Sequence, residues 1–431
     1  LTLAIGLFTG LIFGLVPALQ ASRSDLLLAM KDESSALRTG RRRFGLRNLF
    51  VMSQISASLL LLIVAGLFIR SLQKAQQIDL GYDVDNVLTV RPEGGLLNSR
   101  ETAPQLVFFH QMLARVRTVP GVEAASLADF IPSGGGRRTT TINVENYTPR
   151  PQENMDVLNG VVASDYFKTM GTTLLAGREF SDRDTEGAPR TVIVNEALAR
   201  RYWPGQSALG KHIAIRDDRQ LEVVGVVKDA TAYIFQKGAL PFFYLPLLQN
   251  PSPGMTLHVR SKGDPMAMLP GVRNEIEALD QSVMLHDAST LSDHLSEALL
   301  MLRLVSTLTG VFGLLALALA IVGVFSVVHY SASRRTREIG IRLALGAQRA
   351  DILRMILKEA LFIVVVGVIA GLFMAIASGR LLASLMFANS GMDPSVYIVV
   401  ALMLIAIAML ACFLPAYKAT QVDPNDALRH E

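Results

Sequence analysis

The chain has 431 residues, about half of them hydrophobic (51%), yet it also carries 41 basic and 37 acidic side chains, for a net charge of +4. This combination excludes a chain that lies wholly in lipid, and it indicates a membrane protein with a large water-exposed part. The single cysteine, Cys412, excludes an intrachain disulfide and a cysteine-based metal site.

Five apolar segments have no charged residue in their interior, and each is long enough for a membrane-spanning helix of roughly 20 residues. In chain order they are residues 1–22, 48–70, 304–330, 359–380 and 394–417. A cleaved signal peptide is the alternative explanation for the first segment. The sequence shows no initiator Met, basic n-region or clear cleavage site there, so we expect a transmembrane helix.

The arginines predict how these helices are oriented. Basic residues crowd the connections 23–47 and 331–358, whereas 381–393 contains no Lys or Arg. By the positive-inside rule the first two connections are cytoplasmic and the third is not. Residues 71–303 then form an extracytoplasmic domain, and 418–431 form a cytoplasmic tail.

An internal repeat links the two ends of the chain. Residues 17–31 (PALQASRSDLLLAMK) and 415–429 (PAYKATQVDPNDALR) both follow an apolar span, and five positions match at one constant offset. The first span therefore resembles the last transmembrane helix of an upstream copy, and the full-length protein would hold two modules in tandem. After each span we expect a short helix along the cytoplasmic face, capped by Asp25 in one copy and Asp423 in the other.

The block 71–303 has the pattern of an α+β domain. Residues 86–91, 103–119 and 121–127 predict a strand, a helix and a strand, and 256–260, 265–279 and 283–287 repeat this order. The two units bracket a middle part. We therefore expect a split α/β subdomain with an inserted β-rich subdomain at about 160–248, which includes a hairpin turn at Asp217–Asp218.

The middle part also contains a false phosphate loop. Residues 205–212 (GQSALGKH) match GxxxxGK[ST] except at His212, which replaces the hydroxyl residue that would bind magnesium. A phosphate loop has to lead into a helix, whereas the residues after Lys211 alternate as strands do. We therefore interpret Gly205 and Gly210 as turn glycines, with no nucleotide site.

Other patterns for catalysis or nucleic-acid binding are weak. The histidines are scattered, and His286–Asp287 with Asp293–His294 is a possible metal pair that we interpret as solvated residues near a helix start. No GxSxG elbow is present. The basic runs lie beside predicted membrane helices, where they face anionic lipid headgroups rather than nucleic acid.

The connection 331–358 carries the most specific pattern. Residues 336–344 contain good helix formers with an i, i+4 pair, Glu338 and Arg342, and Gly346 ends this helix before a second one starts at Arg349. The segment resembles the coupling loop of the MacB/FtsX-like family of ABC transporter permeases, whose signature is R-E-I-G-I-R-x-A-x-G-A. It is matched here by Arg337, Glu338, Ile339, Gly340, Ile341, Arg342, Ala344, Gly346 and Ala347.

The resemblance extends over nearly the whole chain, and it implies an architecture. This is an α-helical membrane domain, consisting of a four-helix FtsX-like module plus one helix from an upstream copy, with a large α+β extracytoplasmic domain. The expected place is the bacterial cytoplasmic (inner) membrane. The resemblance also implies a permease with no enzymatic activity and no cofactor of its own, paired with a second permease module in the same full-length chain.

The partner implied by the resemblance is a cytoplasmic ABC ATPase dimer that binds the coupling loop. In this hypothesis Ile339, Ile341 and Leu345 present an apolar surface to the ATPase, and Arg337, Glu338 and Arg342 orient it. A solvated loop that only joins two helices is the plain alternative. The expected output is efflux or mechanotransmission. A membrane sensor and an FtsX-type regulator of cell-wall hydrolases that transports nothing are the alternatives.

Glycines at four-residue spacing also suggest close helix contacts. They are Gly6, Gly10 and Gly14 in the first span, and Gly367 and Gly371 in the fourth. The spacing itself leaves open whether these contacts lie within one module or between two modules.

Overall fold

The structure is a computed structural model of the chain. It describes residues 46–76, 79–98, 101–132, 138–215, 219–230, 239–252, 254–382 and 393–420. The predictions for the first span, for the repeat and for the short helices at the two ends lie outside the described residues, as do Gly6, Gly10, Gly14 and the turn at Asp217–Asp218.

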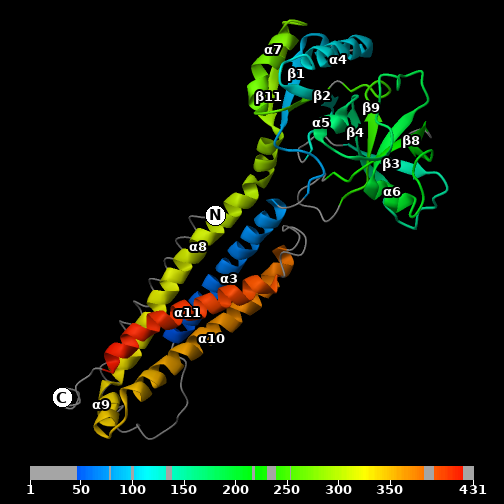
Figure 1. The fold of residues 1–431 in the computed structure, drawn as a ribbon. Helices are drawn as coiled ribbons and strands as arrows, with labels where there is room; N and C mark the ends of the chain where they lie inside the picture. The colour runs from blue at the N-terminus through cyan, green and yellow to red at the C-terminus, as the bar shows by residue number, and fades with distance from the viewer. Residues whose placement is uncertain are drawn as a thin grey trace. The chain divides into compact units, whose positions relative to one another are not determined.

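Four helices of the described part are long and apolar enough to cross a membrane, which confirms the last four predicted spans. They are α3 (Leu46–Gln76), α8 (Leu291–Arg334), α10 (Arg349–Leu382) and α11 (Pro394–Ala419), and Figure 1 shows them as the long coiled ribbons.

Helix α8 begins well before Leu304, where its uncharged stretch starts. At 44 residues it is about 66 Å long, roughly twice the hydrocarbon thickness. Thr290 starts it with a capping box, in which its hydroxyl accepts from the Asp293 N–H (3.1 Å) while the Asp293 carboxylate accepts from the Thr290 N–H (3.0 Å). In this first part Leu299 and Leu302 are buried, whereas Glu297 and Arg303 are exposed. A search for uncharged runs misses such an amphipathic stretch.

Small residues bring α3 and α10 together. A Cβ on Gly367 would lie 2.9 Å from the Ile55 Cβ, and a Cβ on Gly371 would lie 2.9 Å from the Ser56 carbonyl oxygen. The Ser56 hydroxyl donates to the Gly367 carbonyl oxygen at 2.8 Å. These two glycines therefore make a contact within the module, which answers for them the question that their spacing left open.

Ion pairs join the helices at both ends of the bundle. Arg70 of α3 pairs with Asp393, the N-cap of α11, and Lys74 lies 3.8 Å from the same carboxylate. At the opposite end Arg335 pairs with Glu359 of α10 at 2.9 Å. Each pair joins ends that the predicted topology places on one side of the membrane.

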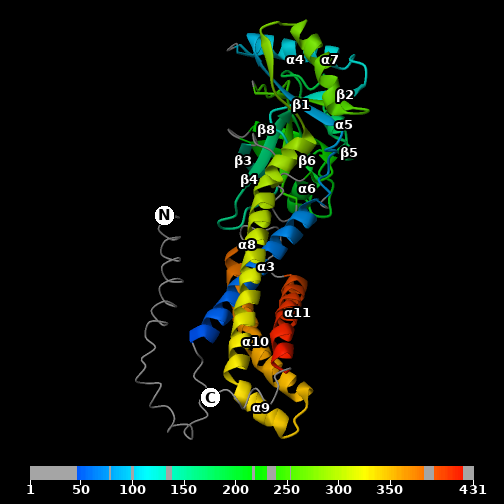
Figure 2. The same cartoon turned by 90° about the vertical axis from the view of Figure 1, so that its left-hand side faces the viewer.

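The outer strands and helices of the extracytoplasmic domain form the predicted split subdomain. Its antiparallel sheet has the order β11-β1-β10-β2. The strands are β1 (Val87–Gly94), β2 (Val122–Ala128), β10 (Thr256–Ser261) and β11 (Val283–Thr290), with short 3-10 helices η2 (Gly95–Asn98) and η3 (Pro265–Met268) beside them. The helices α4 (Thr102–Val116) and α7 (Leu269–Glu277) lie together in Figure 2, and their apolar faces cover one face of the sheet.

The middle part consists mainly of strands and begins earlier than the predicted residue 160. Its elements are β3 (Arg138–Val144), β4 (Asp156–Val162), α5 (Tyr166–Met170), β5 (Leu174–Gly177), β6 (Thr191–Asn195), α6 (Glu196–Tyr202), β7 (His212–Ile215), β8 (Arg219–Val227) and β9 (Phe242–Pro246). Strand β4 meets β2 at one register pair, Ala128 with Val162, so the sheet continues from one subdomain into the other.

The false phosphate loop folds as predicted. Gly205 and Gly210 both have positive φ, 72° and 74°, and Lys211 leads into strand β7 rather than into a helix. Strand β7 pairs antiparallel with β8, which confirms the hairpin.

Candidate coupling site

The connection 331–358, which is predicted to be cytoplasmic, folds into a short helix between two membrane helices. Helix α9 (Thr336–Ala344) follows α8 with only Arg335 between them, and α10 starts at Arg349. Gly346 has φ +95°, and the Ala347 N–H donates to the Arg342 carbonyl oxygen at 3.0 Å, as expected where a glycine in the left-handed region ends a helix. The predicted helix, its end and the next start are therefore confirmed.

The isoleucines and the leucine of the motif do not share one face. Ile339 is only 1% exposed and belongs to the core cluster of the bundle, together with Ala332, Ile352 and Ile356. The prediction that Ile339 contributes to an exposed apolar surface is therefore wrong. Residues two apart on a helix point in nearly opposite directions, so Ile339 and Ile341 cannot face the same partner.

An apolar surface remains on the outer side of α9. Ile341 is 43% exposed, and Leu345, the residue directly after α9, is 83% exposed. The Leu345 N–H donates to the Ile341 carbonyl oxygen at 3.0 Å, so the helical i, i+4 spacing continues and places the two side chains side by side. Gly340, by contrast, is buried, and Ala347 is partly buried. We call Ile341 and Leu345 the outer apolar pair.

Charged residues border this pair. Glu338 and Arg342 form the predicted i, i+4 ion pair at 2.6 Å, and both side chains are about half exposed. The Arg342 guanidinium also lies 2.7 Å from the Met355 Sδ of α10. Arg337 and Ala344 belong to α9, but their side chains lie outside the described part. The orienting role of Arg337, Glu338 and Arg342 stays a prediction.

The ion pair between Arg335, the residue between α8 and α9, and Glu359 of α10 was not predicted from the sequence. Arg335 stands two residues before the motif, and Glu359 is the first residue of the predicted span 359–380. The available signal was an acidic residue at the mouth of a membrane helix, with several arginines in the preceding connection.

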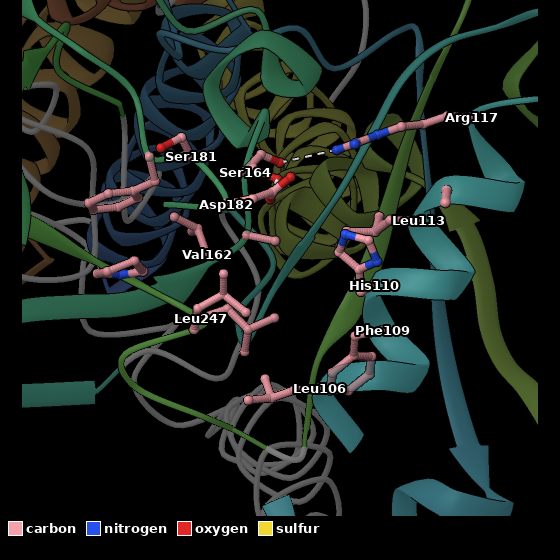
Figure 3. A pocket seen from close by; sticks show the side chains of 15 residues that line it. Leu106, Phe109, His110, Leu113, Arg117, Val162, Ser164, Ser181, Asp182 and Leu247 are labelled. Carbon is pink, nitrogen blue, oxygen red and sulfur yellow. Dashed lines mark hydrogen bonds between the residues drawn. The ribbon is translucent and has the colours of Figure 1, made fainter. Parts of the chain in front are cut away.

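The extracytoplasmic domain contains a small pocket of about 70 Å³ between α4 and the middle part. Figure 3 shows His110 on α4 and Arg117, the residue that follows this helix, facing Ser164 and Asp182 across the pocket. The Arg117 guanidinium donates to the carbonyl oxygens of Ala125 (3.0 Å) and Ser164 (3.5 Å), and the Ser164 hydroxyl donates to the Asp182 carboxylate at 3.2 Å. Hydrogen bonds thus link Arg117, Ser164 and Asp182, and we assign no chemistry to the pocket.

The described residues contain no group of three or more His, Cys, Asp or Glu side chains that could hold a metal ion. Of the proposed metal pair, Asp293 caps α8, and Asp287 pairs with Arg91 at 3.2 Å. The His294 Nε2 lies 3.0 Å from the Thr89 hydroxyl and 2.8 Å from the Ser289 hydroxyl. These residues lie near a helix start, as interpreted, but His294 is partly buried and joins the start of α8 to the sheet rather than being solvated.

A second histidine, His258, is completely buried in the same sheet. It lies between Thr89 and Ser126 in the strand register, and its Nδ1 lies 3.1 Å from the Thr256 carbonyl oxygen. Burial lowers the pKa of His258 to about 4, because the charged ring would lose its hydration. The ring is therefore neutral near pH 7 and acts as part of the core.

Two family models match the chain. The MacB-like periplasmic core domain matches residues 51–279, and the FtsX-like permease C-terminal matches residues 310–424. The first of these alone accounts for more than half of the chain.

Curated relatives agree with these models. The chain is 25% identical over 331 residues to the macrolide export ATP-binding/permease protein MacB of Agrobacterium fabrum, which covers 72% of this chain and 50% of the relative. It is 25% identical over 427 residues to the protein of the same name from an Azoarcus species, covering 95% and 60%. It is 24% identical over 290 residues to the uncharacterized ABC transporter permease YknZ of Bacillus subtilis, covering 65% and 72%.

The chain thus spans about half the length of the MacB relatives that it matches. The matches cover both of its parts, because the periplasmic model ends before α8 and the permease model begins within it. With four membrane helices and the large extracytoplasmic domain, these findings show that the chain belongs to the MacB/FtsX-like family of ABC transporter permeases.

Proposed function

We propose that this chain couples ATP hydrolysis by a separate cytoplasmic ABC ATPase dimer to motion of its extracytoplasmic domain. The observation that carries the proposal is the geometry of α9, which turns Ile339 into the bundle and the outer apolar pair away from it. A short helix with one face fixed and the other apolar and exposed suits a partner that has to grip the membrane domain.

The chemistry of the exposed face describes the partner. Ile341 and Leu345 require an apolar recess, and burying such side chains supplies about 1.5–3 kcal/mol each. Glu338 and Arg342 neutralise each other at 2.6 Å, so they lie beside the recess without adding a net charge. In this proposal the ion pair sets the direction in which the helix enters the recess.

The path from α9 to the outside runs along α8. This helix starts at the last residue of β11, since Thr290 ends that strand and caps the helix. Leu291 is buried against the sheet, and His294 is bonded to Thr89 and Ser289. A displacement of α8 would thus reach the sheet without a flexible linker.

The remaining parts of the proposal concern the surroundings of the chain. We place it in the bacterial inner membrane, next to a second permease module in the full-length protein and in contact with lipid.

A wide apolar groove of about 590 Å³ between α10 and α11, lined by Leu372, Tyr397 and Leu402 among others, suits acyl chains. Export of a substrate and mechanotransmission to an external enzyme use the same coupling step.

The proposal is tested by site-directed photocrosslinking. Cys412 is replaced by serine, Leu345→Cys is introduced and labelled with benzophenone, and the full-length protein is co-expressed with candidate ATPases. We expect a crosslink to one ATPase, with a yield that changes when ATP is trapped. Ile339→Cys is the matched control, because this buried position should resist labelling. The absence of a crosslink to every candidate ATPase would contradict the proposal and favour the sensor alternative.

A further inference from the structure

The junction between α8 and α9 consists of one residue, Arg335. Its backbone closes α8, with its N–H donating to the Ala332 carbonyl oxygen at 3.2 Å, and its own carbonyl oxygen accepts from the Ile339 N–H at 2.9 Å. Its side chain reaches a third helix, since the guanidinium lies 2.9 Å from the Glu359 carboxylate of α10. Both side chains of this ion pair are partly buried.

Two further contacts follow along α9. Ile339 packs in the cluster that contains Ile352 and Ile356 of α10, and Arg342 contacts Met355. Arg335, Ile339 and Arg342 follow each other along the chain, and the α10 residues near them lie between Ile352 and Glu359. Arg335 makes the first of these contacts, at the point where α8 ends.

We infer that Arg335 is a positioning residue whose ion pair with Glu359 fixes the α8–α9 junction to α10. We call this ion pair and the junction that it fixes the joint. While the ion pair is formed, a displacement of α9 moves α8 and α10 together. When it is broken, α9 rotates about Arg335 and displaces neither helix fully. The inference rests on the proposed function for its purpose, but the joint itself can be measured without an ATPase.

Other ion pairs of the described part do not serve this purpose. Glu338 and Arg342 lie in one helix, so their pair cannot join two. Arg70 and Asp393 join α3 to α11 at the opposite end of the bundle. A pair that is partly shielded from water holds its geometry better than a fully exposed one, because solvent screens it less.

The test is a charge swap in the full-length chain. Three variants, Arg335→Glu, Glu359→Arg and the double swap, carry spin labels at the exposed positions Ser333 and Arg354 in a Cys412→Ser background. The parent should show one narrow distance between α8 and α10. Each single variant should lose it, because like charges then face each other, and the double swap should restore it. Arg335→Lys should retain most of it.

Controls separate the joint from general instability and from the proposed function. Arg335→Gln replaces Arg335→Glu if the charge reversal prevents folding. As a control for charge swaps in general, exchanging Arg115 and Glu275, a 3.9 Å pair between α4 and α7, should leave the distance between α8 and α10 unchanged. A narrow distance in Arg335→Glu and Arg335→Gln would overturn the inference. The Leu345 crosslink is measured in parallel. If the variants keep both the narrow distance and the crosslink, the inference about Arg335 fails and the proposed function stands. If the parent itself gives no crosslink, the proposed function is contradicted, and the distance measurement still decides the inference.

Discussion

The extracytoplasmic domain and helix α9 use their apolar residues in opposite ways. In the domain, Phe109, Phe167 and Phe243 are fully buried, and in the pocket of Figure 3 hydrogen bonds link Arg117, Ser164 and Asp182. In α9, one isoleucine is buried, while Ile341 and Leu345 stay exposed. The domain thus buries these large apolar side chains, whereas α9 and the residue after it expose two, where we propose that the ATPase binds. Mutations in the core of the domain should therefore lower its stability, whereas mutations in the outer apolar pair should weaken coupling to the ATPase.

The largest expected effect is a core truncation. Phe243→Ala in β9 should destabilise the domain by about 3–5 kcal/mol, because Phe243 is completely buried and its removal leaves a cavity. The single tryptophan, Trp203, is buried in the same core cluster, so its fluorescence during urea unfolding reports on this domain. Leu175→Ala, at a half-exposed position, is the control and should change little. A similar loss in both variants would contradict the role of Phe243 in the buried core.

Acid should weaken the domain through His258. The pKa of this ring is about 4 in the folded chain and near 6.5 when unfolded, so the unfolded state binds more protons between these values. The contribution is complete above pH 6.5 and is lost as the pH falls toward 4, by about 3 kcal/mol in total. Urea unfolding at pH 7, 5.5 and 4.5 measures it, and His258→Gln should remove this part of the slope. An unchanged slope in that variant would show that other groups dominate.

A substitution in the outer apolar pair should weaken binding to the ATPase without changing the stability of the domain. Ile341→Asp places a carboxylate in the contact with the ATPase, and we expect binding to weaken ~30-fold, the equivalent of a 2 kcal/mol hot spot. Trp203 unfolding should be unchanged, because Ile341 is exposed in the free chain. Binding is measured with purified ATPase and the full-length permease. Equal affinities for the parent and the variant would show that α9 is not the contact.

The smallest expected effect lies at the connection between the two regions. Thr290→Ala removes the hydroxyl that accepts from the Asp293 N–H, which should cost about 1 kcal/mol at the start of α8. Hydrogen exchange of the first turn of α8 should then accelerate, with Thr290→Ser as the conservative control. If exchange of this turn is already fast in the parent, the strand-to-helix connection is not the rigid one that the proposed coupling needs.

The local pattern of apolar and polar residues was sufficient to predict most of the helices and strands named in the sequence analysis. The predicted strand, helix and strand at 86–127, the second set at 256–287 and the helix at 336–344 all agree with the structure. The spacing of apolar residues and the residues that end an element both lie within each segment. Gly346 after α9 is an example of a residue that ends a helix. The start of α8 was missed because its apolar stripe alternates with charged residues, so that no uncharged run marks it.

The sequence by itself determined which segments are long and apolar enough to cross a membrane, which side the arginines favour and which motif lies in the coupling loop, because these properties depend on neighbouring residues. Only the tertiary structure decided that Ile339 faces inward, that Gly367 meets Ile55 and that Arg335 reaches Glu359. Each of these depends on how separate helices pack, and packing depends on shape and distance between residues that no local period relates.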